Sequence, residues 1–97
     1  MCQINDTINL QTIDKLQVKE LAKNEAFQIL SISLEKGAIF PEHTSPTDAH
    51  LIVLEGEIIF NIQKESHRLR SKQSLAFPKE TKHWVSSNEN SKFLIVR

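Results

Sequence analysis

The feature that most constrains the fold of this chain is a series of short apolar runs separated by residues that favour turns. None of these runs after Phe27 is long enough to form a typical helix, and Gly, Pro, Asn, Asp and Ser stand between them. The expected strands cover residues 27–35, 39–43, 49–54, 58–63, 68–70, 75–77, 83–86 and 92–96. Many short strands at even spacing predict an all-β sandwich or barrel.

The N-terminal third of the chain is harder to assign. Residues 1–6 are polar and are expected to be loosely held. The stretch Thr7–Ile13 alternates apolar and polar side chains, which predicts a first strand. The stretch Leu16–Glu25 allows two interpretations, because its Leu, Ala, Lys and Glu content suits a helix whereas Leu16 and Val18 alternate as in a strand.

Length and composition limit the classes of protein this chain can belong to. Its 97 residues form a single domain over residues 1–97, and the formal net charge is zero. A neutral chain with scattered lysines gives no electrostatic reason to expect nucleic acid or a membrane as partner. Cys2 is the only cysteine, and neither a secretory signal nor a membrane-length apolar run is visible, so we expect a cytoplasmic protein.

Two histidines forty residues apart stand in short stretches that invite a functional interpretation. The first stretch runs from Gly37 through His43 to Gly56, and the second runs from Pro78 to His83. Glycine at such positions can adopt the positive φ of a tight turn or bulge between strands. Histidine is a common metal ligand and a common acid or base near neutral pH.

These stretches resemble the two sequence motifs of the cupin family, the first at about residues 37–56 and the second at about residues 72–88. The resemblance implies a jelly-roll β-barrel that often holds a metal between such histidines. Two of the four positions that carry metal ligands in that family differ here, because they hold Ser45 and Ala49. Lys72 and Glu80 replace two of the family's glycines, so we expect those turns to adopt other geometries.

The resemblance therefore supplies His43 and His83 as metal ligands, whereas catalytic zinc and non-haem iron sites use three protein ligands. Strand parity directs His50 and Glu42 away from the barrel interior. Asp48 lies in a loop, from which it can turn inward, and is the remaining candidate for a third ligand. The divalent ions to consider are zinc, nickel, iron and manganese.

We expect a small-molecule-binding barrel rather than an enzyme, because half of the family's ligand set is absent. The predicted ligand pocket consists of His43, Ser45, Leu51, Val53 and His83. The alternative is a metal-dependent enzyme of the dioxygenase or isomerase type, with His43 and His83 as metal ligands. A third possibility is a structural dimer with a closed barrel and no pocket. The simplest interpretation of the two histidines is that they bond to each other, to Ser45 or to water.

The resemblance also implies a homodimer. A barrel this small leaves an edge strand or an apolar outer face that a second copy can cover. The expected dimer face is formed by Leu30, Ile32 and Leu34, or alternatively by Ile59.

Overall fold

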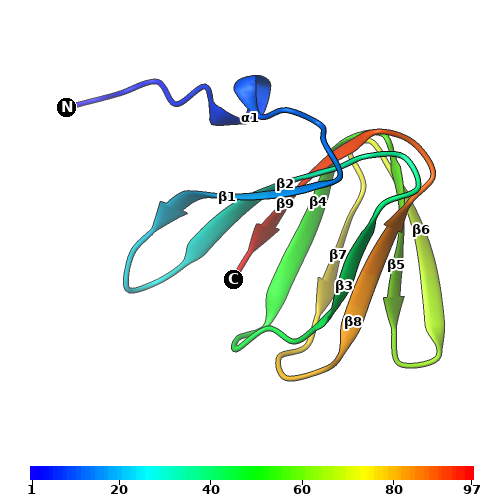
Figure 1. Cartoon of the computed structure of the whole chain (residues 1–97). Coiled ribbons are helices and arrows are strands. Elements are labelled where there is room, and N and C mark those ends of the chain that lie inside the picture. Colours follow the sequence, from blue (N-terminus) through cyan, green and yellow to red (C-terminus); the bar gives the residue numbers. More distant parts are fainter.

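The computed structural model describes all 97 residues as one small, nearly all-β domain. Its two antiparallel sheets pack face to face as a jelly-roll barrel (Figure 1). One sheet has the strand order β1-β2-β9-β4-β7 and the other has the order β3-β8-β5-β6. The elements are α1 (Thr7–Leu10), β1 (Leu16–Lys23), β2 (Gln28–Leu34), β3 (Ile39–His43), β4 (Ala49–Glu55), β5 (Glu57–Ile62), β6 (Glu65–Arg70), β7 (Ser74–Phe77), β8 (His83–Ser87) and β9 (Ser91–Val96).

Alternation along the strands builds the core between the two sheets. On β4, for example, Ala49, Leu51 and Val53 are buried whereas Ile52 faces the other way and is half-buried. Thirteen buried apolar residues form one cluster: Ile32, Leu34, Ala49, Leu51, Val53, Ile58, Phe60, Ile62, Leu69, Phe77, Val85, Phe93 and Ile95. The predicted all-β jelly-roll fold is therefore confirmed. No helix of the chain is long and apolar enough to cross a membrane.

The N-terminal segment differs from the predicted first strand. Residues Thr7–Leu10 form one helical turn, because Asn5 Oδ1 accepts the Thr7 amide at 2.9 Å and the Asp6 carbonyl accepts the Leu10 amide at 3.1 Å. These local bonds replace the ladder that a strand would need. In the stretch Leu16–Glu25 the strand interpretation is the right one, since β1 pairs with β2 from Leu16 to Lys23 and this pairing overrides helix propensity.

The two turns at Lys72 and Glu80 have the positive φ typical of glycine, although neither residue is glycine. Lys72 has φ of 71° and Glu80 has φ of 57°, so the expectation of other turn geometries is wrong. The Lys72 amide donates to the Val53 carbonyl and the Glu80 amide donates to the Ser45 carbonyl, both at 2.8 Å. These bonds hold each residue in the left-handed region, which costs a side-chain-bearing residue about 1–2 kcal/mol.

Replacing Lys72 or Glu80 with glycine is expected to stabilise the protein. Each substitution removes the cost of the left-handed backbone. Glycine is also more flexible in the unfolded chain, which offsets part of this stabilisation, so we expect the free energy of unfolding to increase by about 0.5–1 kcal/mol. Urea denaturation with an unchanged m-value measures the effect. Lys64→Gly is the matched control, because Lys64 lies in a turn without positive φ and should lose stability. An equal loss in all three variants would contradict the argument.

One of the two expected dimer faces lies inside the barrel. Ile32 and Leu34 are fully buried in the core, and Leu30 packs against the same cluster. This expectation is wrong because the even-numbered positions of β2 face the opposite sheet, whereas Ile29, Ser31 and Ser33 occupy its outer face. Ile59 of β5 alternates with the buried Ile58 and Phe60 and is half-buried on the outside of the four-stranded sheet.

Candidate functional site

The two histidines predicted from the motifs meet in the structure. His43 is the last residue of β3 and His83 is the first residue of β8, and the two are direct partners in the antiparallel pairing of these strands. Side chains at directly opposed positions lie on the same face. The two imidazole centroids are 4.2 Å apart in an edge-to-face arrangement.

Backbone hydrogen bonds fix the same proton position on both rings. Nδ1 of His43 lies 2.6 Å from the Pro41 carbonyl oxygen, and Nδ1 of His83 lies 2.9 Å from the Thr81 carbonyl oxygen. A carbonyl oxygen only accepts, so each Nδ1 carries the hydrogen and donates it. Each neutral ring then presents the unprotonated Nε2 as a hydrogen-bond acceptor or metal ligand.

Aromatic side chains surround the histidine pair. Phe40 stacks on His43 with ring centroids 4.3 Å apart, whereas Phe77 and Phe60 lie against His83 at 4.6 Å and 5.4 Å. His83 is 1% exposed and His43 is half-buried. One imidazole is therefore enclosed by apolar rings, and the other lies between this enclosure and the surface.

Burial lowers the pKa of His83 below its ordinary value of 6.5, because the positive form loses its hydration in this apolar surrounding. The Thr81 carbonyl opposes the shift by accepting from the ring, and the charges of His43 and Arg97 add to it. His83 is consequently neutral near pH 7.

The depressed pKa of His83 predicts a loss of stability as the pH falls. Below pH 6.5 the unfolded chain binds a proton at this residue more readily than the folded chain does, so stability is present above pH 6.5 and is lost as pH drops through the folded pKa. The loss should reach about 1.4 kcal/mol for each unit by which the folded pKa is lowered. Urea midpoints measured between about pH 5 and 7.5 check it, a window chosen to stay above the Glu57 titration.

His83→Gln is the control for this pH dependence, because glutamine can donate to the Thr81 carbonyl but does not titrate. The variant should show a flatter profile than the wild-type protein over the same window. Parallel profiles would assign the pH dependence to another group.

The other predicted pocket residues form hydrogen bonds within loops or pack in the hydrophobic core. Ser45 is buried and its hydroxyl donates to the Thr47 carbonyl at 2.7 Å, within its own loop. Leu51 and Val53 are fully buried in the core. Asp48, the predicted third ligand, accepts the Lys79 amide at 3.0 Å. The structure thus brings His43 and His83 together, whereas the polar groups of Ser45 and Asp48 bond to the Thr47 carbonyl and the Lys79 amide.

Two open hollows flank the barrel, and neither includes the histidine pair. One, of about 340 Å³, is lined by Asp48, His50, Ala76, Phe77 and Pro78. The other, of about 250 Å³, is lined by the β1–β2 turn, Gln28, Pro46, Thr47 and Arg97. Phe77 is the link between the first hollow and the site, because its ring also lies against His83.

The side chains at this site do not fit a resident catalytic metal. No group of three His, Cys, Asp or Glu residues is close enough together to hold an ion. The family's remaining ligand positions carry the hydrogen-bonded Ser45 and the buried, apolar Ala49. Catalytic zinc and non-haem iron need three protein ligands, so His43 and His83 alone fall one short.

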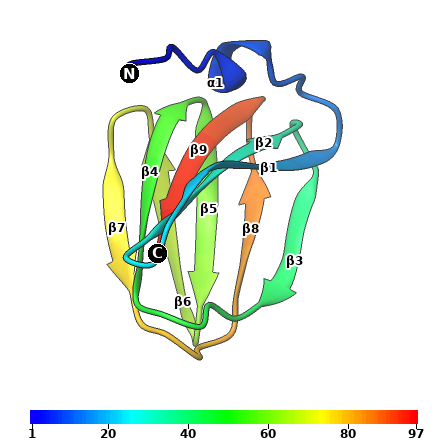
Figure 2. The same cartoon turned by 90° about the vertical axis from the view of Figure 1, so that its left-hand side faces the viewer.

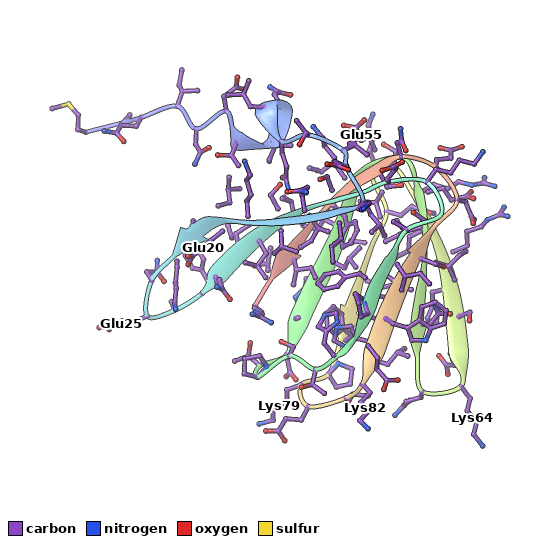
Figure 3. All side chains as sticks on the ribbon, in the orientation of Figure 1. Glu20, Glu25, Glu55, Lys64, Lys79 and Lys82 are labelled. Atoms are coloured by element: carbon purple, nitrogen blue, oxygen red, sulfur yellow. The ribbon has the colours of Figure 1, made fainter.

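The end of the barrel that carries the histidines has charges of both signs. Figure 3 shows Lys64, Lys79 and Lys82 at this end, on the β5–β6 turn and the β7–β8 loop. Glu65 is the first residue of β6, directly after the β5–β6 turn, and Glu80 belongs to the β7–β8 loop. The rim therefore shows no marked preference for an anionic or a cationic ligand.

The carbonyls of Pro41 and Thr81 are the functional groups that sequence reasoning missed. Both lie two residues before a histidine, and both fix which ring nitrogen carries the proton. No side-chain pattern marks a backbone acceptor, since every residue has a carbonyl. That each histidine bonds to the carbonyl two residues before it becomes apparent only in the folded structure.

A two-sheet barrel with paired inward histidines is the architecture of the cupin class, and comparison with known proteins agrees. The sequence profile of the cupin domain matches residues 30–97, so this chain belongs to the cupin family. No curated protein matches it.

Solved structures show the same fold over almost the whole chain. An RmlC-like cupin from Desulfovibrio desulfuricans is 21% identical, with a TM-score of 0.87 over 99% of this chain and 95% of its own. A conserved protein of unknown function from Streptococcus pyogenes is 25% identical, with a TM-score of 0.82 over 98% and 84%. An RmlC-like cupin from Methanocaldococcus jannaschii is 26% identical, with a TM-score of 0.79 over 91% and 83%.

Proposed function

We propose that this cupin is a non-catalytic binding protein whose ligand is a small neutral molecule held at the His43–His83 pair. The observation that carries the proposal is that both imidazoles have Nδ1 committed to a backbone carbonyl, which makes each Nε2 an acceptor. A ligand for such a pair donates hydrogen bonds, as a hydroxyl, amide or amine group does. The phenyl rings around the pair favour an apolar portion next to the donor group.

The mixed charge of the rim and the neutrality of His83 both support an uncharged ligand. An anion would find no fixed positive charge on the His83 ring, because burial lowers the pKa of His83. Entry requires displacement of an aromatic side chain, since no hollow includes either histidine. Phe40 is the candidate gate, because it is half-buried and stacks on the more accessible histidine, His43.

A metal-dependent enzyme of the dioxygenase or isomerase type is the second candidate. One observation favours it: a metal-binding histidine ordinarily donates its other ring nitrogen to a carbonyl or carboxylate, as both histidines do here. The donor set lacks a third side chain. We therefore rank this function below the binding protein.

Thermal unfolding in the presence of small polyols, amides and amines tests the proposal. A ligand at one hundred times its Kd stabilises the folded state by about 2.7 kcal/mol, and each kcal/mol raises the Tm of a domain this size by about 4–8 °C. We expect such a shift in the wild-type protein and its loss in His43→Asn. His67→Asn is the matched control, because His67 is exposed and bonds only Glu65.

Elemental analysis of the purified protein separates the two candidates. Near-stoichiometric zinc, nickel, iron or manganese that is lost in both His43→Asn and His83→Gln would favour the enzyme and contradict the binding proposal. A thermal shift that survives in His43→Asn would place the ligand elsewhere on the barrel.

A further inference from the structure

The smaller of the two hollows contains an arginine that has no acidic partner. This hollow, of about 250 Å³, is lined by the β1–β2 turn on one side and by Pro46 and Thr47 of the β3–β4 loop on the other. Arg97, which follows β9, also lines it and is half-buried. The ion pairs of the structure all involve Glu57 or Glu65 and none involves Arg97. A guanidinium that has lost part of its hydration is usually paired with a carboxylate or a phosphate.

The guanidinium of Arg97 is held in a defined position. The backbone amide of Arg97 donates to the Gln28 carbonyl at 2.9 Å, and the Gln28 amide donates back to the Arg97 carbonyl at 2.6 Å. Figure 2 shows the end of β9 beside the β1–β2 turn. Nε of Arg97 donates to Oε1 of the Gln28 side chain at 2.9 Å. This neutral amide is the only protein group that the guanidinium bonds, so the planar edge formed by its two terminal nitrogens is available to a ligand.

Both walls of the hollow are held in place by hydrogen bonds of their own. In the β1–β2 turn, Oδ1 of Asn24 accepts the amides of Ala26 and Phe27 at 2.8 Å and 3.0 Å. In the β3–β4 loop, the Ser45 hydroxyl donates to the Thr47 carbonyl at 2.7 Å. A ligand therefore meets a preformed hollow and does not have to order either wall, which lowers the entropic cost of binding.

The lining combines positive charge with apolar surface. Lys23 adds a second cation at the exposed rim, and Phe27, which is 39% exposed, provides an aromatic wall next to Pro46. Glu25 is the one acidic side chain of the lining. It lies at the tip of the β1–β2 turn, and its carboxylate is directed away from the barrel in Figure 3. The hollow thus offers a fixed guanidinium beside an apolar wall, a combination that suits an amphiphilic anion.

We propose that this hollow binds a small organic carboxylate, whose charged group lies against the terminal nitrogens of Arg97 and whose apolar body packs against Phe27 and Pro46. The planar guanidinium matches a carboxylate through two parallel hydrogen bonds. Pockets for drug-sized ligands measure about 300–1,000 Å³, so a hollow of about 250 Å³ suits a smaller molecule. No histidine lines the hollow, and the inference is therefore independent of the ligand proposed for the His43–His83 pair.

Titration of the full chain with phenylacetate, followed by amide chemical shifts in NMR spectra, tests the proposal. Phenylacetate joins a carboxylate to an aromatic ring, and phenylacetamide is its uncharged counterpart. We expect phenylacetate to shift the amides of Ala26, Phe27 and Arg97 with a dissociation constant of about a millimolar or lower. Phenylacetamide should bind at least tenfold more weakly, because the charge-assisted hydrogen bonds to the guanidinium are lost.

Two substitutions test the two parts of the hollow separately. Arg97→Gln should weaken phenylacetate binding at least tenfold, because it removes the guanidinium. Arg68→Gln is the matched control and should leave the affinity unchanged, since Arg68 lies on β6 and does not line the hollow. Phe27→Ala should weaken the binding of phenylacetate but not that of acetate, which has no aromatic body to pack against the wall.

Phenylacetate that leaves the three amides unshifted at about 20 mM would overturn the proposal. So would equal affinities for phenylacetate and phenylacetamide, because the anion would then not be what the hollow recognises. Inorganic phosphate that shifts the same amides at lower concentration than phenylacetate would reject the carboxylate as the ligand class. If Arg97→Gln fails to fold, the comparison of phenylacetate with phenylacetamide on the wild-type protein still decides.

Discussion

Gly56→Ala is expected to lower the Tm by about 20 °C, one of the two largest effects of a single substitution in this protein. Gly56 joins β4 to β5 with φ of +88°, and a Cβ there would lie 2.5 Å from the Asn90 carbonyl oxygen and 2.7 Å from Ser91 Cα, and would also overlap Ser91 Oγ. The left-handed backbone costs about 1–2 kcal/mol and the collision adds about 1–3 kcal/mol.

The neighbouring chain cannot move aside to make room for the alanine. The Ser91 hydroxyl accepts the Glu57 amide at 3.0 Å and lies within hydrogen-bond distance of the Glu57 and Glu89 carbonyls. A shift of Ser91 would therefore break the bonds that hold the start of β9 against the start of β5. Differential scanning calorimetry of the purified variant measures the loss.

Gly37→Ala is the matched control for this substitution. Gly37 has nearly the same backbone, with φ of +84°, but a Cβ there would meet no atom within 4 Å. This variant should lose only about 1 kcal/mol. Equal losses in the two glycine variants would show that backbone conformation alone, and not the contact with Ser91, makes Gly56 necessary.

The two glycines illustrate what could be predicted from the sequence and what could not. Both were predicted to adopt positive φ, and both do. Their surroundings differ because the pairing of β4 with β9 brings other strands next to Gly56. The residues adjacent to each glycine in the sequence do not indicate this pairing. Lys72 and Glu80 show the converse, since flanking strands and two backbone hydrogen bonds impose a turn that the residue type alone disfavours.

The strands after Phe27 were predictable because each has an inward face that must be apolar. The apolar residues of the sequence therefore indicate the buried positions. The segment Thr7–Ile13 was not predictable, because its alternation has no partner strand and local hydrogen bonds to Asn5 and Asp6 prevail. At the site, motif spacing was sufficient to place His43 opposite His83. The tautomer of each ring and the enclosure of His83 arise from residues distant in sequence, so they required the folded structure.

Phe60→Ala is expected to destabilise the protein by about 3–5 kcal/mol, a large share of the 5–15 kcal/mol typical of a domain. Phe60 is fully buried, and its ring lies against Phe77 at 4.9 Å and against His83 at 5.4 Å. Its removal leaves a cavity in the centre of the barrel, beside the histidine pair. Urea denaturation measures the loss.

The milder Phe60→Leu variant separates the role of Phe60 in the core from its role at the site. It keeps most of the apolar volume but loses the ring that packs against His83, so the imidazole is less tightly enclosed and the pKa of His83 should rise back toward 6.5. Proton NMR titration of the His83 ring measures this change. Phe93→Leu is the matched control, because Phe93 is equally buried but makes no ring contact with a histidine. Similar stability losses with a pKa change only in Phe60→Leu would assign the enclosure of His83 to Phe60, whereas an unchanged pKa in both variants would show that the backbone and Phe77 suffice.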